Sequence, residues 1–307
     1  MRVERYKVGW GGSLVYAMWG TLNAAGDNAV LLPSYYTGTH ERYAPLIGAG
    51  RALDPARYFI VAPNLFGNGV STSPSHGGAF PALSLEDNVH AQHELLQSLG
   101  VTSLALAAGW SMGAMQALHW AMLYPAMVRN VVAVCGTAFC WPINSVFLRG
   151  IAPILENANE MGEQLALDLF GRAYCGWAYS AAFFREGLYR VLGFATPDAL
   201  LDDWAADHKT HRAADLLAAL NAWADTARAP EAASAALSRI TARCFLLPCE
   251  TDAYFKVQDA TFEAACIPYA TLLPLASPYG HCAGAPGRFA AESARIEEIF
   301  VQALKEA

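Results

Sequence analysis

Charge is scarce in this chain. Only 15% of its 307 residues are Asp, Glu, Lys or Arg, whereas about 25% is usual. Lys and Arg number 20 and Asp and Glu 27, which gives a net charge of −7, and no dense basic run is present. These features argue against binding to nucleic acid or to an anionic membrane surface, and against a disordered or coiled-coil chain. The apolar share of 54% instead allows a large buried core.

The longest gap in charge covers residues 95–128. It exceeds the roughly 20 residues that a membrane-spanning helix needs. Gly100, Gly109 and Pro125 interrupt it, however, and divide it into pieces too short to span a bilayer. We therefore predict that this segment is the buried middle of a globular fold.

A disulfide framework and a signal peptide are also lacking. The 7 cysteines are an odd number without regular spacing, which is typical of a reduced chain with buried thiols and no metal site. The N-terminal residues 1–7 alternate charged with apolar side chains and contain no apolar signal-peptide core. The sequence therefore predicts a cytoplasmic protein.

Short apolar runs alternate with longer helical stretches in both halves of the chain. The expected strands are residues 29–32, 58–62, 104–107, 131–134, 244–247 and 271–273, and the expected helices are 43–52, 85–99, 114–123, 259–265 and 289–304. This rhythm predicts an α/β fold with a mostly parallel sheet covered by helices on both faces. Between the two halves the sequence is helical in pattern and rich in aromatic residues. We therefore predict a sheet domain of residues 1–136 and 240–307 and an inserted helical cap of residues 137–239. The cap is expected over the carboxyl edge of the sheet.

The run Gly109-Trp110-Ser111-Met112-Gly113 has the pattern G-x-S-x-G. It follows an expected strand directly and opens an expected helix, which is the setting of a nucleophile elbow. Its glycines permit the sharp turn that lifts a serine hydroxyl above the sheet. Ser111 is therefore the candidate nucleophile.

A serine nucleophile needs a base and a carboxylate that orients the base. Asp252 and His281 follow later expected strands, in the chain order Ser, acid, His that α/β-hydrolases use. Glu250 is the alternative acid, although Asp252 lies further into its loop. Among the other histidines, His208 and His211 stand among charged residues of the cap and are expected on a solvated face.

Acyl transfer also needs two N–H donors for the developing oxyanion. One is expected from the backbone of Met112, and the second from Tyr36 in the loop after the strand at residues 29–32. Tyr35 and Tyr36 could alternatively be pocket lining only. The side chains expected to form an apolar acyl pocket, with ordinary core packing as the alternative for each, are Tyr35, Phe66, Trp110, Trp141 and Tyr279.

Further motifs accompany these residues. They are YTGTH at 36–40, PNLFG at 63–67, MQAL at 115–118, CGWAYS at 175–180 and GH at 280–281. With the serine motif they resemble the homoserine O-acetyltransferase family of α/β-hydrolases over residues 28–285, and most closely its shorter homologues. The resemblance implies a triad of Ser111, Asp252 and His281, a covalent acyl-enzyme and a cap that bounds an acyl tunnel.

Two departures from that family argue against homoserine as the acceptor. Cys282 stands directly after His281, where family members that acetylate homoserine have an acid, and Lys256 replaces a proline. We therefore expect a serine esterase for small carboxylic esters, with no cofactor and no metal. The alternatives are an O-acyltransferase with acyl-CoA as co-substrate, and a non-catalytic binding protein. A homodimer is compatible with the sequence.

Overall fold

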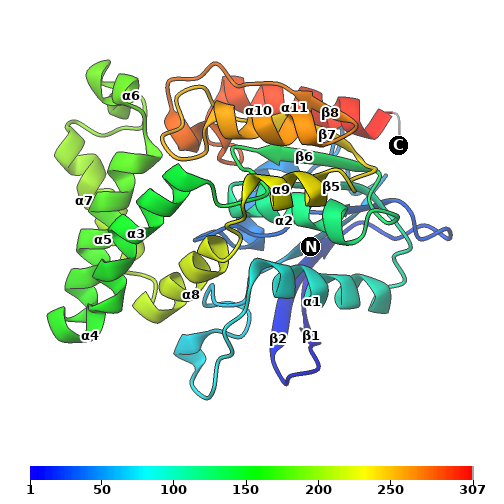
Figure 1. Cartoon of the computed structure of the whole chain (residues 1–307), viewed down its shortest axis with the longest axis horizontal. Coiled ribbons are helices and arrows are strands. Elements are labelled where there is room, and N and C mark those ends of the chain that lie inside the picture. The colour runs from blue at the N-terminus through cyan, green and yellow to red at the C-terminus, as the bar shows by residue number, and fades with distance from the viewer. Residues whose placement is uncertain (306–307) are drawn as a thin grey trace.

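A twisted sheet forms the centre of the molecule (Figure 1). Within residues 1–305, which the computed structural model describes, eight strands form one sheet in the order β1-β2-β4-β3-β5-β6-β7-β8. They are β1 (Arg2–Lys7), β2 (Ser13–Trp19), β3 (Ala29–Leu31), β4 (Phe59–Pro63), β5 (Leu104–Trp110), β6 (Asn130–Val134), β7 (Arg243–Leu247) and β8 (Ala270–Leu272). Only β2 pairs antiparallel, with β1 and β4. The predicted α/β fold with a mostly parallel sheet is confirmed.

Helices cover both faces of this sheet. They are α1 (Leu85–Ser98), α2 (Met112–Leu123), α10 (Val257–Cys266) and α11 (Ala290–Lys305). Side chains of β6 alternate between two core clusters: Val132 and Val134 pack in the cluster that includes α11, while Val131 and Ala133 pack in the one that includes α1 and α2. This alternation is the reason that the central strands read as continuous apolar runs.

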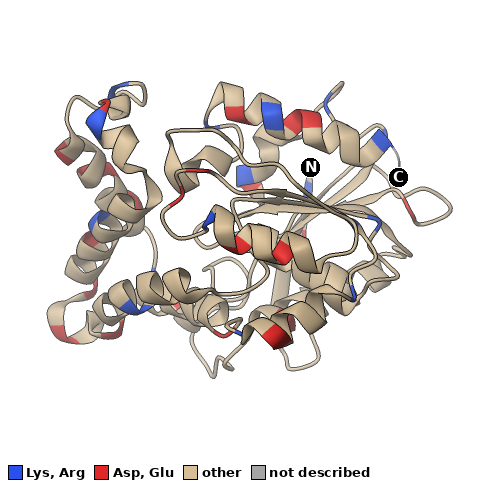
Figure 2. Cartoon of the chain, turned by 45° about the horizontal axis from the view of Figure 1, so that its top comes forward, with Lys and Arg blue, Asp and Glu red and all other residues tan. Residues whose placement is uncertain are grey.

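The charge-free segment runs from the end of α1 through β5 to the loop after α2. Every residue of α2 from Met112 to Met122 is buried, as expected for a mostly apolar helix, and the polar Gln116 and His119 have hydrogen-bond partners there. Figure 2 shows the charged residues mainly on the outer helices and loops, with the central strands almost free of them. Among the described residues, no helix has the length and apolar character that crossing a bilayer requires.

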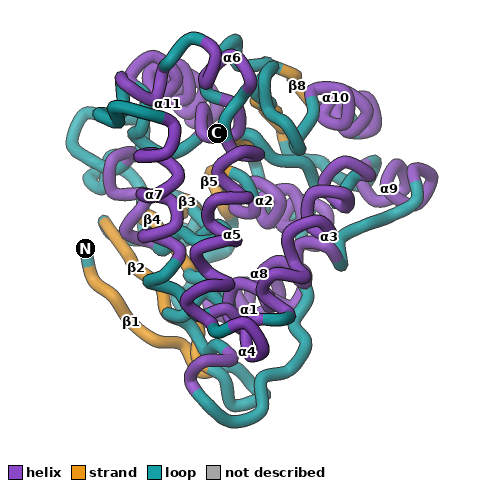
Figure 3. Tube along the Cα trace, turned by 90° about the vertical axis from the view of Figure 1, so that its left-hand side faces the viewer, coloured by secondary structure: helices purple, strands orange, loops and turns teal. Residues whose placement is uncertain are grey.

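A group of helices follows β6 and precedes β7 in the chain. Most of them stand to one side of the sheet in Figure 1, and Figure 3 views the molecule from that side. The last one, α9 (Pro230–Leu237), instead lies beside the sheet and contacts α10. The group contains α3 (Pro142–Glu156), α4 (Ala158–Met161), α5 (Glu163–Ala178), α6 (Ala181–Arg185), η3 (Leu188–Arg190), α7 (Pro197–His208), α8 (Ala213–Ala224) and α9. Helix α5 packs between α3 and α7. Aromatic rings such as Phe147, Phe170 and Tyr174 fill the space between these helices.

Two local expectations were incomplete or wrong. Residues 43–52 do not form an α-helix: only the 3₁₀ helix η1 (His40–Leu46) is present there, because Pro45, Gly48 and Gly50 disfavour a longer helix. The β1–β2 hairpin was not predicted, since β1 is a largely exposed edge strand without an apolar run. The remaining 3₁₀ helices are η2 (Pro74–His76) and η4 (Gly280–Gly284).

Candidate active site

Ser111 occupies a strained turn between β5 and α2. Its φ is 58°, and only one other non-glycine residue in the described chain, Cys135, has a positive φ. Side chains other than glycine rarely adopt this conformation, and such strain is typical of functional positions. The strand-turn-helix context expected for G-x-S-x-G is therefore present.

The two glycines of the motif are required by close contacts. A Cβ on Gly109 would lie 2.3 Å from the backbone carbon of Gly113, and a Cβ on Gly113 would lie 2.6 Å from the carbonyl oxygen of Pro33. Neither contact is possible without moving backbone. The glycines thus let α2 approach both its own strand and the loop after β3, which is the loop expected to complete the oxyanion hole.

Asp252 and His281 meet although 29 residues separate them. His281 Nδ1 lies 2.7 Å from Asp252 Oδ2, and both side chains are buried. The other carboxylate oxygen, Asp252 Oδ1, accepts hydrogen bonds from the backbone N–H groups of Tyr254 and Phe255, each at 3.0 Å. These bonds fix the carboxylate plane, so Asp252 can hold the imidazole in one orientation. Glu250 is exposed and has no such partner among the described residues.

Aromatic rings enclose His281. Its ring centroid lies 5.1 Å from that of Trp110, 4.6 Å from that of Tyr254 and 5.4 Å from that of Phe255. The Trp110 indole N–H also donates to the His281 carbonyl at 3.1 Å. Trp110, beside the candidate nucleophile, therefore positions the histidine loop as well as lining the cavity.

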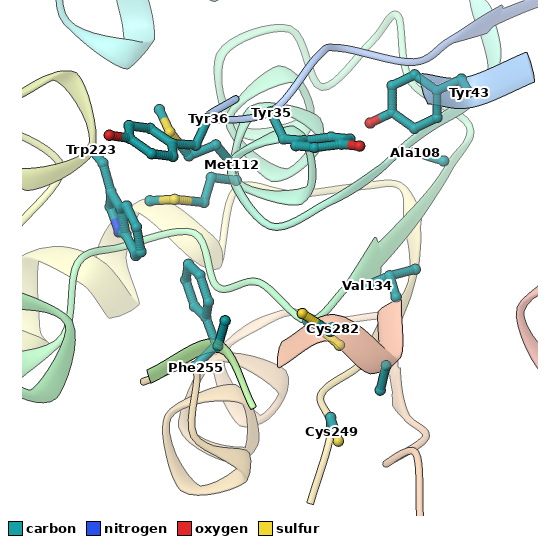
Figure 4. Packing of buried hydrophobic residues seen from close by; sticks show 14 of the residues in the cluster. Tyr35, Tyr36, Tyr43, Ala108, Met112, Val134, Trp223, Cys249, Phe255 and Cys282 are labelled. Atoms are coloured by element: carbon teal, nitrogen blue, oxygen red, sulfur yellow. The ribbon is translucent and has the colours of Figure 1, made fainter. Parts of the chain in front are cut away.

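The two expected oxyanion donors have free amides. Neither the backbone N–H of Tyr36 nor that of Met112 donates to a partner among the described residues. Met112 is the first residue of α2, where helix N–H groups have no intrahelical acceptor. Figure 4 shows Tyr35 and Tyr36 on one loop, with Met112 next to Tyr36. Both amides remain candidates for holding an oxyanion.

A cavity of about 660 Å³ lies between these loops and the helices that follow β6. Ser111 and His281 line it, together with Tyr35, Tyr36 and Trp110 from the expected set. The residues that sequence reasoning did not assign to it include Arg42, Tyr174, Asp203, Trp204, Asp207, His208, Tyr254, Cys282 and Arg288. The nucleophile and the base thus share one cavity.

His208 lies on the inner face of α7, and its expected solvated position is therefore wrong. It is 2% exposed and its ring packs against that of Trp204, one helical turn earlier. The apolar spacing of Leu200, Trp204 and His208, four residues apart each time, could have indicated this buried face.

Three expected pocket residues lie outside the cavity. Phe66 packs against Trp10 with a centroid distance of 5.3 Å, in the core cluster of α1 and α2. Tyr279 stacks on Phe289 at 3.7 Å. Trp141 packs on Phe262 at 5.1 Å, so its ring faces α10. Each of these rings instead packs against another aromatic ring outside the cavity.

Trp141 belongs to a hydrogen-bonded group around Glu263 that the sequence did not reveal. The buried Glu263 carboxylate accepts hydrogen bonds from the Trp141 indole and from the backbone N–H groups of Ala138 and Phe139. It thereby ties α10 to the segment that leaves β6. Burial raises the pKa of Glu263 to about 7, although the three donors act in the opposite direction.

We expect Glu263→Gln to change how stability depends on pH. The folded protein holds the Glu263 proton more tightly than the unfolded chain does, so the protonated carboxyl stabilises the fold. This contribution to stability is complete below about pH 4.5 and is lost as the pH rises through 7. The loss should amount to about 3 kcal/mol. Urea unfolding of the wild type and the variant at pH 5 and pH 8 measures it. If the difference in unfolding free energy between the two proteins is the same at pH 5 and at pH 8, the prediction is contradicted. Glu298→Gln, at an exposed position, is the control.

Cys282 lies beside His281 in the cavity wall and is buried. Burial raises the pKa of its thiol to about 11. The thiol is therefore neutral near pH 7 and cannot pair with a substrate ammonium as an acid at this position would.

Among the described residues, no group of three or more His, Cys, Asp or Glu side chains is arranged to hold a metal ion.

The chain is similar to several known proteins. The model of the α/β hydrolase fold matches residues 29–156. An ethyl acetate hydrolase of Pseudomonas veronii is 32% identical over 308 aligned positions, which cover 93% of this chain and 87% of that protein. The solved structure of the acetyl esterase MekB has a TM-score of 0.93 at 29% identity and covers 99% of this chain and 97% of its own.

The predicted resemblance to homoserine O-acetyltransferases is also confirmed, over a shorter span. The enzyme of Nostoc punctiforme is 38% identical over 157 aligned positions, which cover 46% of this chain and 44% of that protein. In sequence, the ethyl acetate hydrolase thus aligns along nearly the whole chain, whereas this transferase aligns along less than half of it. Fold, serine turn and full-length similarity agree, and the chain belongs to the α/β-hydrolase family.

Proposed function

We propose that this protein hydrolyses small carboxylic esters through a covalent intermediate on Ser111. One observation carries the proposal: His281, joined to the buried Asp252 at 2.7 Å, lines the same cavity as a serine in a strained elbow. Full-length similarity to an ethyl acetate hydrolase and an acetyl esterase supports an ester as the substrate. Residues 137–239 would then act as a cap over the reacting group.

In the first half of the proposed reaction, Ser111 Oγ attacks the ester carbonyl carbon while His281 Nε2 takes the serine proton. The Asp252 carboxylate stabilises the imidazolium and keeps its orientation. The amides of Tyr36 and Met112 donate to the oxyanion. When the tetrahedral intermediate collapses, the carbon–oxygen bond to the alcohol breaks, and His281 gives its proton to the departing alcohol.

In the second half, a water molecule replaces the alcohol. The water oxygen attacks the acyl-Ser111 carbonyl carbon while His281 takes a proton from the water. His281 then returns that proton to Ser111 Oγ as the ester bond to the enzyme breaks. The products are the carboxylic acid and free enzyme. Hydrolysis, unlike transfer, requires no binding site for an amino-acid acceptor. A neutral Cys282 thiol beside the base fits hydrolysis, because it offers no negative charge to a substrate ammonium.

An O-acyltransferase that uses acyl-CoA is the second candidate. The similarity to homoserine O-acetyltransferases favours it, and the first half-reaction would be the same with a thioester donor. The neutral Cys282 argues against homoserine as the acceptor.

We expect p-nitrophenyl acetate to release acetate without any added acceptor, whereas acetyl-CoA releases little thiol. The measurement follows nitrophenol and free thiol in parallel, with and without a hydroxyl acceptor such as homoserine or glycerol. Thiol release that requires the acceptor would favour the transferase and overturn hydrolysis as the main activity.

A further inference from the structure

The loops that carry the candidate acid and base leave neighbouring strands, β7 and β8. Main-chain pairing continues past the ends of these strands to a last bridge between Cys249 and Leu275. Beyond this bridge lie the acid loop, residues 251–256, and the histidine loop, residues 277–284. Both loops are within the described chain, and no backbone-to-backbone hydrogen bond joins them. Contacts that involve side chains must therefore hold the two loops together.

One hydroxyl group bridges the two loops. Thr251 Oγ1 donates to the Ser277 carbonyl oxygen at 2.6 Å and accepts a hydrogen bond from the Gly280 N–H at 3.1 Å. In the sequence, Thr251 directly precedes Asp252, and Gly280 directly precedes His281. The Thr251 side chain therefore crosslinks the loops one residue away from the 2.7 Å contact between carboxylate and imidazole.

This bridge needs a group that both donates and accepts, as a hydroxyl does. Without it, the Gly280 N–H would have no acceptor among the described residues. The Ser277 carbonyl would keep only a weak contact with the Cys249 thiol, at 3.5 Å. Valine has nearly the shape of threonine but can neither donate nor accept, so Thr251→Val removes the bridge with little change in volume.

The inserted helices hold the histidine loop on its other side. The Ser180 hydroxyl donates to the Pro278 carbonyl. Gly280 has a φ of 62°, and a Cβ there would lie 2.8 Å from the Ala178 carbonyl oxygen and 2.8 Å from the Ser180 nitrogen. A loop packed this closely on one side can shift chiefly on the other, where Thr251 sets its distance from the acid loop.

We propose that Thr251 is a positioning residue of the active site: its hydroxyl fixes the spacing of the two loops and, through it, the contact of Asp252 with His281. Thr251 does not line the cavity, so it acts through this pair rather than on the substrate. A misplacement of about 1 Å can lower an enzymatic rate by about 10²-fold. The proposal rests on the proposed ester hydrolysis and adds to it a residue outside the triad.

Thr251→Val and Thr251→Ser together test the role of the hydroxyl. For p-nitrophenyl acetate we expect kcat to fall about tenfold in Thr251→Val, with KM changed less than about twofold, because acylation and deacylation both use His281 and substrate binding does not use Thr251. Thr251→Ser keeps the hydroxyl and should retain most of the wild-type kcat. If Thr251→Val does not fold, Thr251→Ala replaces it, since alanine puts no methyl group against the Ser277 carbonyl.

Thr102→Val is the matched control. The Thr102 hydroxyl also donates to main-chain carbonyls, those of Ala25 and Gly26. Thr102 precedes β5, however, whereas Ser111 follows it, so the control changes a threonine at the opposite end of the strand. It should hydrolyse the ester at a near wild-type rate.

A double-mutant cycle separates positioning from a general structural effect. If Thr251 acts through Asp252, adding Thr251→Val to Asp252→Asn should lower kcat less than about twofold, against about tenfold in the wild type. Where turnover is too slow, the rate at which a fluorophosphonate modifies Ser111 gives the same comparison, because that reaction also uses the base. Melting temperatures of all four proteins show that each is folded under the assay conditions.

Three results would overturn the proposal: a wild-type kcat in Thr251→Val, a Thr251→Ser as slow as Thr251→Val, or the same factor of loss in both backgrounds of the cycle. The last result would mark a structural role that is independent of Asp252. Failure of the proposed function looks different, since the wild type itself would then hydrolyse no ester and a fluorophosphonate would leave its Ser111 unmodified.

Discussion

Replacing Ser111 with alanine should reduce ester hydrolysis by roughly 10⁶-fold, the scale known for removing the nucleophile of a serine hydrolase. The reason is that no acyl-enzyme can form, so only the free amides of the proposed oxyanion hole and ground-state binding remain to assist water. Turnover of p-nitrophenyl acetate by purified Ser111→Ala and wild-type protein measures the effect.

A fluorophosphonate identifies the nucleophile independently of turnover. It should modify the wild type at Ser111, as located by peptide mass spectrometry, and should leave Ser111→Ala unmodified. Ser98→Ala is the matched control, because Ser98 is exposed at the end of α1 and lies outside the motif. A folded wild-type protein without an adduct on Ser111 would exclude both the esterase and the acyltransferase, and would leave the non-catalytic binding protein.

Replacing Asp252 with asparagine should lower turnover by about 10⁴-fold. Asp252 Oδ1 accepts two backbone hydrogen bonds, from Tyr254 and Phe255, which only the asparagine carbonyl oxygen can replace. The asparagine NH₂ group must then face His281 Nδ1, at the position of the present 2.7 Å contact. A donor there leaves Nδ1 unprotonated and puts the proton on Nε2, so the ring cannot accept the proton of Ser111.

Glu250→Gln is the control for this variant, since the exposed Glu250 was the alternative acid in the sequence. It should hydrolyse p-nitrophenyl acetate at a near wild-type rate. If Asp252→Asn kept most of the activity while Glu250→Gln lost it, the orienting role would pass to Glu250. Circular dichroism of both variants checks that neither result reflects unfolding.

Much of the fold could be predicted because its signals are local. Central strands such as β5 and β6 are apolar on both faces, so they stand out in the sequence, and Ser84 with Asp87 forms a capping box, another local signal, at the start of α1. The edge strand β1 packs few side chains into the core and gave no such signal. The helix expected at residues 43–52 was predicted from an apolar pattern. It does not form, because Pro45, Gly48 and Gly50 disfavour a longer helix there.

The aromatic residues were the least predictable part of the site. Trp110 and Tyr35 line the cavity, but Phe66, Trp141 and Tyr279 do not. A large ring gains about as much by packing in the core as by lining a pocket, so its type alone does not assign it to either. The burial of Glu263 could not be predicted either, because its three hydrogen-bond donors lie more than 120 residues earlier in the chain.

The sequence by itself determined the parallel strands of the sheet, the serine turn and the order of the candidate triad, because each depends on neighbouring residues: a strand, two glycines and a helix for Ser111, and loops at the ends of later strands for Asp252 and His281. Only the tertiary structure decided what surrounds the reacting serine. Tyr174 from the inserted helices meets Tyr254 from the loop after β7 through long-range packing, and such contacts follow from how the helices pack on the sheet rather than from any local pattern. The scarcity of charge indicated where the core lies, and long-range packing decided which aromatic rings surround His281.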